Sequence, residues 1–275
     1  MKVRGLITLD NVGIQRAGRI LLDRVNLAFE PGQVTVIVGP NGAGKSTIVK
    51  LASGELAPSS GSVTLGGQPL RRSSPRELAL RRAVLPQSTD ARSGLTVREL
   101  ATLGISLLGT GLSPAGCAPL VEQALDRVGL AGCADRAVER LSGGERQRAH
   151  LARVLVQLWA AARHHGPGTL LLDEPIAAQD LAHQLRVLEI AREHADDGGA
   201  VGIVLHDLNW AAHVADRLVV LHEGRVHAVG APATVLTREM LAAVYGVALQ
   251  PGAVTDRPFL LPQMATLRPD GSGPF

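Results

Sequence analysis

Apolar and polar positions alternate along the first part of the chain, and this pattern predicts short β-strands. Residues 6–14 (LITLDNVGI) and 25–30 (VNLAFE) read as strands, and after a Pro-Gly turn residues 33–38 (QVTVIV) read as a buried strand. Residues 61–70 (GSVTLGGQPL) predict one more edge strand. The chain is therefore expected to begin with β-structure.

The middle of the chain has a helical period. Residues 45–54 (KSTIVKLASG) have helical spacing that stops at a glycine. Residues 95–161 read mostly as helices, in the runs TVRELATLGI, APLVEQALDRVGL and GGERQRAHLARVLVQLWAAA, with a loop at GTGLSPAG. They predict a helical subdomain.

From residue 169 onward apolar strands alternate with amphipathic helices. The predicted strands are TLLLDE, GIVLH, RLVVLHEG and RVHAVG, and the predicted helices are DLAHQLRVLEIAREHA and DLNWAAHVA. This alternation predicts an α/β fold with a parallel sheet covered by helices. Residues 246–275, rich in Pro and Gly towards their end, are expected to form a C-terminal extension in extended or loose structure.

The length and amino-acid composition of the chain exclude several classes of protein function. A chain of 275 residues that is 45% hydrophobic can bury the core of one compact unit. No apolar run is long enough to span a bilayer and the first residues lack a secretory pattern, so a cytosolic chain is expected. Cys117 and Cys133 lack metal-site spacing, which disfavours zinc or a disulfide. The basic run at residues 70–84 is read as a solvated helix face, and with six aromatic residues in all no nucleic-acid partner is expected.

The stretch GPNGAGKST carries the first chemistry. It matches G-x-x-x-x-G-K-[ST] and follows a predicted strand, the context of a phosphate-binding loop. Its backbone N–H groups would cradle ATP phosphates at a helix N-terminus, Lys45 would reach the β- and γ-phosphates, and Ser46 would bind Mg²⁺. A glycine-rich turn without a ligand is the alternative. The predicted nucleotide-binding residues are Gly39, Pro40, Asn41, Gly42, Ala43, Gly44, Lys45, Ser46 and Thr47.

Two acidic residues follow the buried run TLLL. Asp173 would lie near the Mg²⁺ shell, and Glu174 would orient an attacking water and accept its proton. Taken alone, the two acids could simply cap the next helix. Together with the glycine loop they predict an NTPase site.

The string LSGGERQR supplies the third element, with Ser142, Gly143 and Gly144 at the start of a long predicted helix. An ordinary helix start with Ser142 as N-cap is the alternative. Because this string precedes the acidic strand by about 30 residues, the chain resembles the nucleotide-binding subunit of ATP-binding-cassette (ABC) transporters over residues 5–245. The resemblance implies a P-loop NTPase cassette with a RecA-like core over residues 1–245, an N-terminal antiparallel β subdomain and the helical subdomain of residues 95–161 inserted.

The same resemblance assigns further roles. Gln87 falls at the family's Q-loop glutamine, a ligand of Mg²⁺ and the water, and His206 falls at the switch histidine that contacts the γ-phosphate. Asp180 closes the segment that crosses to a second subunit. As alternatives, Gln87 could be a turn residue and His206 a satisfied core polar group.

In this family two cassettes pack head to tail, and the signature of one completes the ATP site of the other. A homodimer with two ATP sites is therefore implied, or a pair with a similar cassette. Two copies of a transmembrane permease would form the transport pathway through the membrane. The chain would be bound peripherally to them at the cytoplasmic face of a bacterial inner membrane. Residues 87–105 are expected to form the groove for the permease, with burial of their small and apolar residues in the core as the alternative.

Three departures from the family pattern concern the site. Arg16 occupies the position of the usual adenine-stacking aromatic, and its flat guanidinium is expected to stack on the base. The segment PIAAQD stands where the family has PTSALD, so Ile176, Ala177 and Gln179 depart from the pattern of the contact across the dimer while Asp180 is kept. The insertion QLWAAARHHGPGT is read as a solvated loop in which His164 and His165 bind no metal.

The end of the cassette is similar to importers of iron chelates, haem and cobalamin, which share HDLN and VYG. The insertion is similar to ATPases of haem importers, so hemin uptake, with a periplasmic haem-binding protein as indirect partner, is expected. A ferric siderophore or cobalamin importer is the alternative. Other classes, a soluble ABC ATPase acting on nucleic acid or ribosomes and a small-molecule kinase, are disfavoured.

Overall fold

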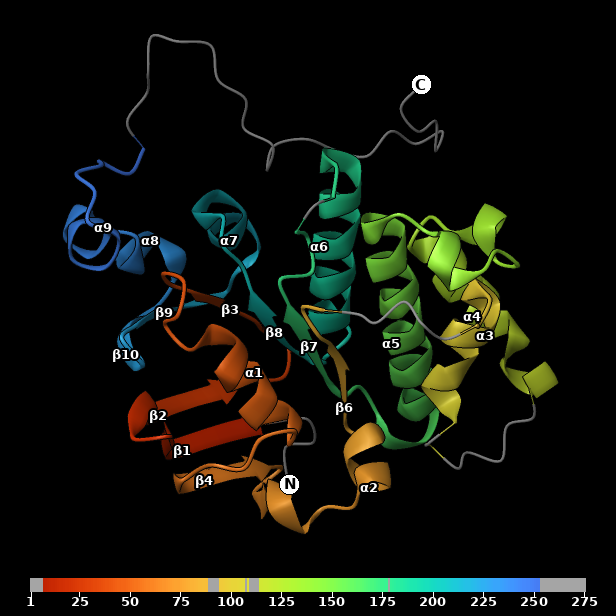
Figure 1. The fold of residues 1–275 in the computed structure, drawn as a ribbon, viewed down its shortest axis with the longest axis horizontal. Helices are drawn as coiled ribbons and strands as arrows, with labels where there is room; N and C mark the ends of the chain where they lie inside the picture. Colours follow the sequence, from red (N-terminus) through yellow and green to blue (C-terminus); the bar gives the residue numbers. More distant parts are fainter. Residues whose placement is uncertain (1–6, 89–93, 107, 109–113, 178, 253–275) are drawn as a thin grey trace, which may run out of the picture.

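The computed structural model describes residues 7–88, 94–106, 108, 114–177 and 179–252. Its strands form two sheets, one of four strands in the order β2-β1-β4-β5 and one of six in the order β10-β9-β3-β8-β7-β6. Figure 1 shows the four-stranded sheet at the lower left and the helices α3, α4 and α5 on the right. The α/β class expected from the sequence is confirmed.

The six-stranded sheet is parallel except at one edge. From β9 to β6 all neighbouring strands run parallel, and β10 pairs antiparallel with β9 through a short turn. The strands are β3 (Val34–Val38), β6 (Arg82–Leu85), β7 (Thr169–Asp173), β8 (Ala200–Val204), β9 (Arg217–His222) and β10 (Arg225–Gly230). Parallel order brings the carboxyl ends of β3, β8, β7 and β6 to one edge.

The central strands are mainly apolar because both faces of the sheet are covered, with Thr35 on β3 and Thr169 on β7 as buried polar exceptions. Val36 and Val38 of β3 pack into the core shared with the helical region, whereas Ile37 packs into the core of the N-terminal strands and α1. On β7, Leu170 and Leu172 point to the first core and Leu171 to the second. Successive side chains of a strand point to opposite faces, so a strand covered on both faces has few polar positions.

The four-stranded sheet is antiparallel and differs from expectation in one detail. It contains β1 (Ile7–Arg16), β2 (Arg19–Phe29), β4 (Ser60–Leu65) and β5 (Gln68–Pro69). The prediction of a single edge strand at residues 61–70 was wrong, because Gly66 and Gly67 both have positive φ and turn the chain into a hairpin. As a result β4 is internal and β5 is the edge.

Most of the helices overlap the predicted runs. One helix begins at Pro114, inside the predicted loop GTGLSPAG, and another continues past its predicted run to His165. They are α1 (Lys45–Ser53), α2 (Pro75–Ala79), α3 (Val97–Thr102), α4 (Pro114–Arg127), α5 (Gly143–His165), α6 (Leu181–Asp196), α7 (Leu208–Val214), α8 (Pro232–Val235) and α9 (Arg238–Tyr245). Short 3₁₀ turns occur at Leu70–Arg72, Leu103–Ile105, Ala131–Cys133 and Val138–Arg140. No helix in the described part of the chain is long and apolar enough to cross a membrane.

Two segments differ from the sequence interpretation. His164 and His165 form the last turn of α5 and are not in a loop, and basic residues there suit the negative end of the helix dipole. Helices α8 and α9 were not predicted, although Thr237 caps α9 and Gly246 ends it. Residues 89–93 of the expected permease groove and residues 253–275 of the expected extension lie outside the described residues. The domain boundaries stay predictions.

Candidate functional site

The glycine loop joins β3 to α1 and needs glycine for geometric reasons. Gly39 has φ of 151°, and a Cβ there would lie 2.1 Å from the carbonyl oxygen of Leu221. Gly44 has φ of 102°, and a Cβ there would lie 2.6 Å from Leu22 Cδ2. Gly44 is also the N-cap of α1 and supplies no side-chain cap, so the first N–H groups of the helix are left for an anion.

Lys45 lies inside this loop. Its side chain is buried, and Nζ donates hydrogen bonds to the carbonyl oxygens of Gly39 (2.8 Å) and Pro40 (2.9 Å). Burial lowers the pKa of Lys45, while the charges of Glu174 and Asp173 act in the opposite direction. The ammonium group is thus held by neutral carbonyls at the point where phosphate oxygens are expected.

Asp173 ends strand β7 and faces the start of α1. Ser46 Oγ donates a hydrogen bond of 3.1 Å to Asp173 Oδ1. Burial is the main reason why the pKa of Asp173 is raised, and the Ser46 bond opposes it. This pair of oxygens fits Mg²⁺, which is commonly held by one or two protein oxygens together with substrate phosphates and water. Among the described residues no group of three or more His, Cys, Asp or Glu side chains could bind a metal by itself.

Glu174 is the meeting point of three segments. Gln87 Nε2 donates a hydrogen bond of 2.8 Å to Glu174 Oε2, and His206 Nε2 lies 2.6 Å from Glu174 Oε1. The three residues follow the adjacent parallel strands β6, β7 and β8, which explains why they meet. The Glu174 side chain is 13% exposed and that of His206 47%, so the carboxylate is sheltered beneath an accessible imidazole.

The signature residues lie elsewhere. Ser142 is the N-cap of α5: its Oγ accepts from the backbone N–H of Glu145, whose carboxylate accepts from the N–H of Ser142. The helix-cap alternative therefore holds as a local fact. Helix α5 packs on the opposite face of the six-stranded sheet from α1, and the nucleotide role of Ser142, Gly143 and Gly144 stays a prediction.

Asp180 is the N-cap of α6. It accepts a 3.0 Å hydrogen bond from the backbone N–H of His183, and its carboxylate lies 2.7 Å from His183 Nδ1. Burial raises the pKa of Asp180, but the hydrogen bonds from His183 together with the charges of His183 and Arg148 lower it overall. The carboxylate thus already has partners within its own helix.

A cavity of about 380 Å³ lies beside the glycine loop. It is lined by Arg19, Ile20, Leu21, Pro40, Asn41, Gly42, Ala43, His222, Glu223 and Gly224. Arg16 is exposed and pairs with Arg19 across the β1–β2 ladder, and it is not a lining residue. Sequence reasoning missed Ile20, an apolar side chain that is 63% exposed, because β-hairpin positions next to a ligand have no motif. The stacking role of Arg16 stays a prediction.

One chain therefore brings together part of the predicted site. The glycine loop, Gln87, Asp173, Glu174 and His206 gather at the carboxyl edge of the parallel strands. The signature residues, Asp180 and Arg16 make none of the contacts described above with that group.

A glycine loop at a parallel sheet edge, two acids after the neighbouring strand and an inserted helical region define a P-loop NTPase cassette. Residues 22–177 match the family model described as ABC transporter. The chain belongs to the ABC transporter family.

Curated relatives cover nearly the whole chain. The hemin import ATP-binding protein HmuV of Rhodopseudomonas palustris (strain ATCC BAA-98 / CGA009) is 48% identical over 90% of this chain and 91% of its own length. The proteins of the same name from Chelativorans sp. (strain BNC1) and Rhizobium meliloti (strain 1021) are 48% and 45% identical, over 94% and 95% of this chain and 99% and 100% of theirs.

Solved structures agree on the fold. An ATP-binding subunit of an ABC transporter superposes with a TM-score of 0.75 at 24% identity, over 90% of this chain and 95% of the other. CbiO1 from Clostridium perfringens, part of the ABC transporter complex cbiONQ, gives 0.70 at 26% identity, over 86% of this chain and 92% of the other. The ABC cassette fold expected from the signature is confirmed.

Proposed function

We propose that this chain is the ATP-binding and ATP-hydrolysing subunit of an importer that carries hemin across the bacterial inner membrane. One observation carries the proposal: identity of 45–48% with three hemin import ATP-binding proteins, over at least nine-tenths of each chain. The polar cluster around Glu174 supports the hydrolytic part of the proposal. The family relation supports a complex with a permease that provides the membrane-spanning helices. None of the described helices of this chain could cross a membrane.

In the proposed ATPase reaction each residue of the site has a separate role. Lys45 and the N–H groups of the glycine loop would exchange their present partners for phosphate oxygens. Ser46, Asp173 and Gln87 would hold Mg²⁺, which neutralises phosphate charge when bound. Glu174 would accept a proton from the attacking water, with Gln87 and His206 fixing its carboxylate. The attack itself depends mainly on such positioning and on electrostatic stabilisation.

Two copies acting head to tail would complete the site. The N-terminus of α5 with Ser142, Gly143 and Gly144 lies away from the chain's own loop and would face the γ-phosphate held by the other copy. Asp180, at the start of α6, would lie in the crossing segment. The resulting dimer has two-fold symmetry and two equal ATP sites.

The membrane partners complete the proposal. Each cassette of the dimer would receive one permease copy in its groove of residues 87–105, where Leu103 is 46% exposed. A periplasmic haem-binding protein would deliver the cargo on the other side. The chain itself would be bound peripherally at the cytoplasmic face.

Reconstitution tests the proposal. The tagged Glu174→Gln chain is used to capture its permease from detergent-solubilised membranes, and the corresponding wild-type complex is placed in vesicles with its binding protein. ATPase activity stimulated by hemin-loaded binding protein is the expected result. Stimulation only by a ferric siderophore or by cobalamin would change the cargo, and capture of nucleic acid or ribosomes without a permease would overturn the transport role.

A further inference from the structure

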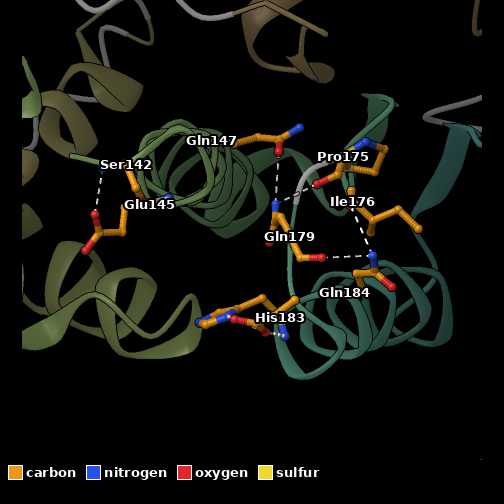
Figure 2. Close-up of polar contacts among 9 residues, drawn as sticks. Ser142, Glu145, Gln147, Pro175, Ile176, Gln179, His183 and Gln184 are labelled. Carbon is orange, nitrogen blue, oxygen red and sulfur yellow. Dashed lines mark hydrogen bonds and ion pairs between the residues drawn. The ribbon is translucent and has the colours of Figure 1, made fainter. Parts of the chain in front are cut away.

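The segment between Glu174 and Asp180 contains a glutamine that departs from the usual family pattern. Gln179 Nε2 donates to the carbonyl oxygen of Pro175 (2.8 Å) and to Gln147 Oε1 (3.0 Å). Gln147 lies on α5, and its Nε2 donates to the carbonyl oxygen of Glu174 (2.9 Å). Figure 2 shows Gln147 reaching down from the signature helix to Gln179, which also points to Pro175.

The chemistry of these groups permits one orientation of both amides. The carbonyl oxygens of Glu174 and Pro175 can only accept, so each must face an amide nitrogen. Gln147 therefore directs Nε2 to the Glu174 carbonyl and Oε1 towards Gln179. This Oε1 accepts one N–H of Gln179 Nε2, while the other N–H is donated to Pro175. Flipping either amide would place oxygen against oxygen. Gln179, oriented by the Pro175 carbonyl, thus reinforces the orientation of Gln147 that the Glu174 carbonyl requires.

The carbonyl held in this way belongs to a strained residue. Glu174 has φ of 52°, in the left-handed region that non-glycine residues rarely adopt. Such conformations persist where neighbouring contacts over-determine them. Here the backbone N–H donates to the Val204 carbonyl (3.2 Å), and the Glu174 carbonyl accepts from Gln147 (2.9 Å) and from the backbone N–H of Ala177 (3.3 Å), so both sides of the residue are held.

Stability alone does not explain Gln179. Its Oε1 is buried and has no hydrogen-bond partner in the described structure, which costs free energy that an apolar side chain would avoid. Gln184 of α6 also binds this segment. Its Nε2 donates hydrogen bonds to the carbonyl oxygens of Gln179 (3.0 Å) and Ile176 (3.5 Å) (Figure 2).

We propose that Gln179 is a positioning residue for Glu174: through Gln147 it helps to hold the Glu174 backbone, and it joins this backbone to the helix that begins with the signature. The inference rests on the proposed ATPase activity. Because Ser142 and Gln147 lie on the same helix, five residues apart, a movement of the signature is transmitted to the Glu174 carbonyl by one hydrogen bond.

A double-variant cycle tests the proposal. Gln147→Met, Gln179→Met and the double variant keep side-chain length and remove the amides, and Gln123→Met makes the same change at an exposed glutamine of α4. Steady-state kcat and KM for MgATP and the affinity for a fluorescent ATP analogue are measured on the full chain. Circular dichroism and Tm confirm folding, and Gln179→Glu, which keeps the shape but removes the N–H donors, is the second variant.

We expect Gln179→Met and Gln179→Glu to lower kcat roughly three- to tenfold, the factor typical of one hydrogen bond, with nucleotide affinity unchanged. The double variant should lose no more than Gln147→Met alone, because Gln179 acts through Gln147. If the loss of kcat in the double variant equals the product of the two single losses, the inference is overturned. It is also overturned if the Gln179 variants have the same kcat as Gln123→Met. A wild-type chain that binds ATP without hydrolysing it would instead overturn the proposed function and this inference with it.

Discussion

His206 Nε2 lies 2.6 Å from Oε1 of Glu174, although 32 residues separate them in the chain. The other oxygen of the same carboxylate accepts from Gln87, so both Glu174 oxygens have a protein partner. Each of the three residues follows a different parallel strand. A carboxylate whose direction is fixed from both sides is poised to meet a water at one position, which favours general-base chemistry.

Replacing Glu174 by Gln tests the role of the carboxylate. The amide keeps the shape but is not basic, so we expect kcat to fall about a hundredfold or more while ATP affinity stays near the wild-type value. Trapping of a nucleotide-bound dimer should accompany the loss, measured by size-exclusion chromatography with MgATP. Turnover at the wild-type rate would remove Glu174 from the chemistry.

Replacing His206 by Ala removes one of the two groups that orient Glu174. A hydrogen bond to a charged group contributes about 1.5–3 kcal/mol, so kcat should fall roughly ten- to a hundredfold. His213 on α7 is an exposed histidine for a matched Ala substitution. Equal kcat for the two variants would show that the contact of His206 with Glu174 has no part in turnover.

The chain has three lysines, at positions 2, 45 and 50, and two of them lie on α1. Lys45→Ala removes the buried ammonium that faces the loop carbonyls, and we expect ATP affinity to fall by a factor of about ten or more. Lys50→Ala is the control, because Lys50 is 52% exposed and its 3.6 Å ion pair with Glu55 is at the surface. Titration calorimetry with ATP compares them. If both variants bind ATP like the wild type, the phosphate-loop assignment is wrong.

Much of the fold could be predicted because its determinants are local. The run QVTVIV becomes β3 since a strand covered on both faces is mainly apolar. KSTIVKLASG becomes α1, which ends at Gly54, a residue with positive φ. The family and the fold class followed from three strings and are confirmed. Gln87, Glu174 and His206 were each predicted, but their mutual contacts come from strand order, which a single sequence does not state.

The remaining features depend on tertiary context. Gln179 was seen only as a departure from the family pattern, because its partner Gln147 lies 32 residues away on another element. The prediction of a loop at His164 and His165 was wrong, because α5 continues past its last buried residue, Ala161, and ends at His165 with Gly166 as C-cap. The apolar period of the sequence did not indicate these last helical residues. Ile20 had no motif, and only the position of β2 beside the glycine loop places it in the cavity.

Two glycines of the loop provide a matched test of the backbone argument. Gly39→Ala combines strain at φ of 151° with a Cβ 2.1 Å from the Leu221 oxygen, so the free energy of unfolding should fall by about 2–4 kcal/mol. Gly42→Ala has open space at φ of 79° and should lose only about 1 kcal/mol, the strain alone. Urea unfolding measures both. Equal losses would contradict the packing argument.

His150 on α5 makes folding stability depend on pH. Burial, followed by the charges of Arg153 and Arg146, lowers the pKa of His150 from 6.5 to about 4. Its Nε2 is buried without a hydrogen-bond partner in the described structure, so the neutral ring is the native form. Above pH 6.5 neither state takes up the proton. Between pH 6.5 and 4 the unfolded chain takes it up while the native chain does not, so stability falls as pH falls.

At pH 5.5 this one group should lower the free energy of unfolding by about 1 kcal/mol relative to pH 7.5. His194 is buried with its pKa lowered in the same direction, so the whole chain should lose more than His150 alone accounts for. His150→Leu fills the site without a titrating or unpaired atom, and urea unfolding at the two pH values should give a smaller difference than for the wild type. An unchanged difference would mean that His150 titrates alike in both states, and the burial argument would then fail at this residue.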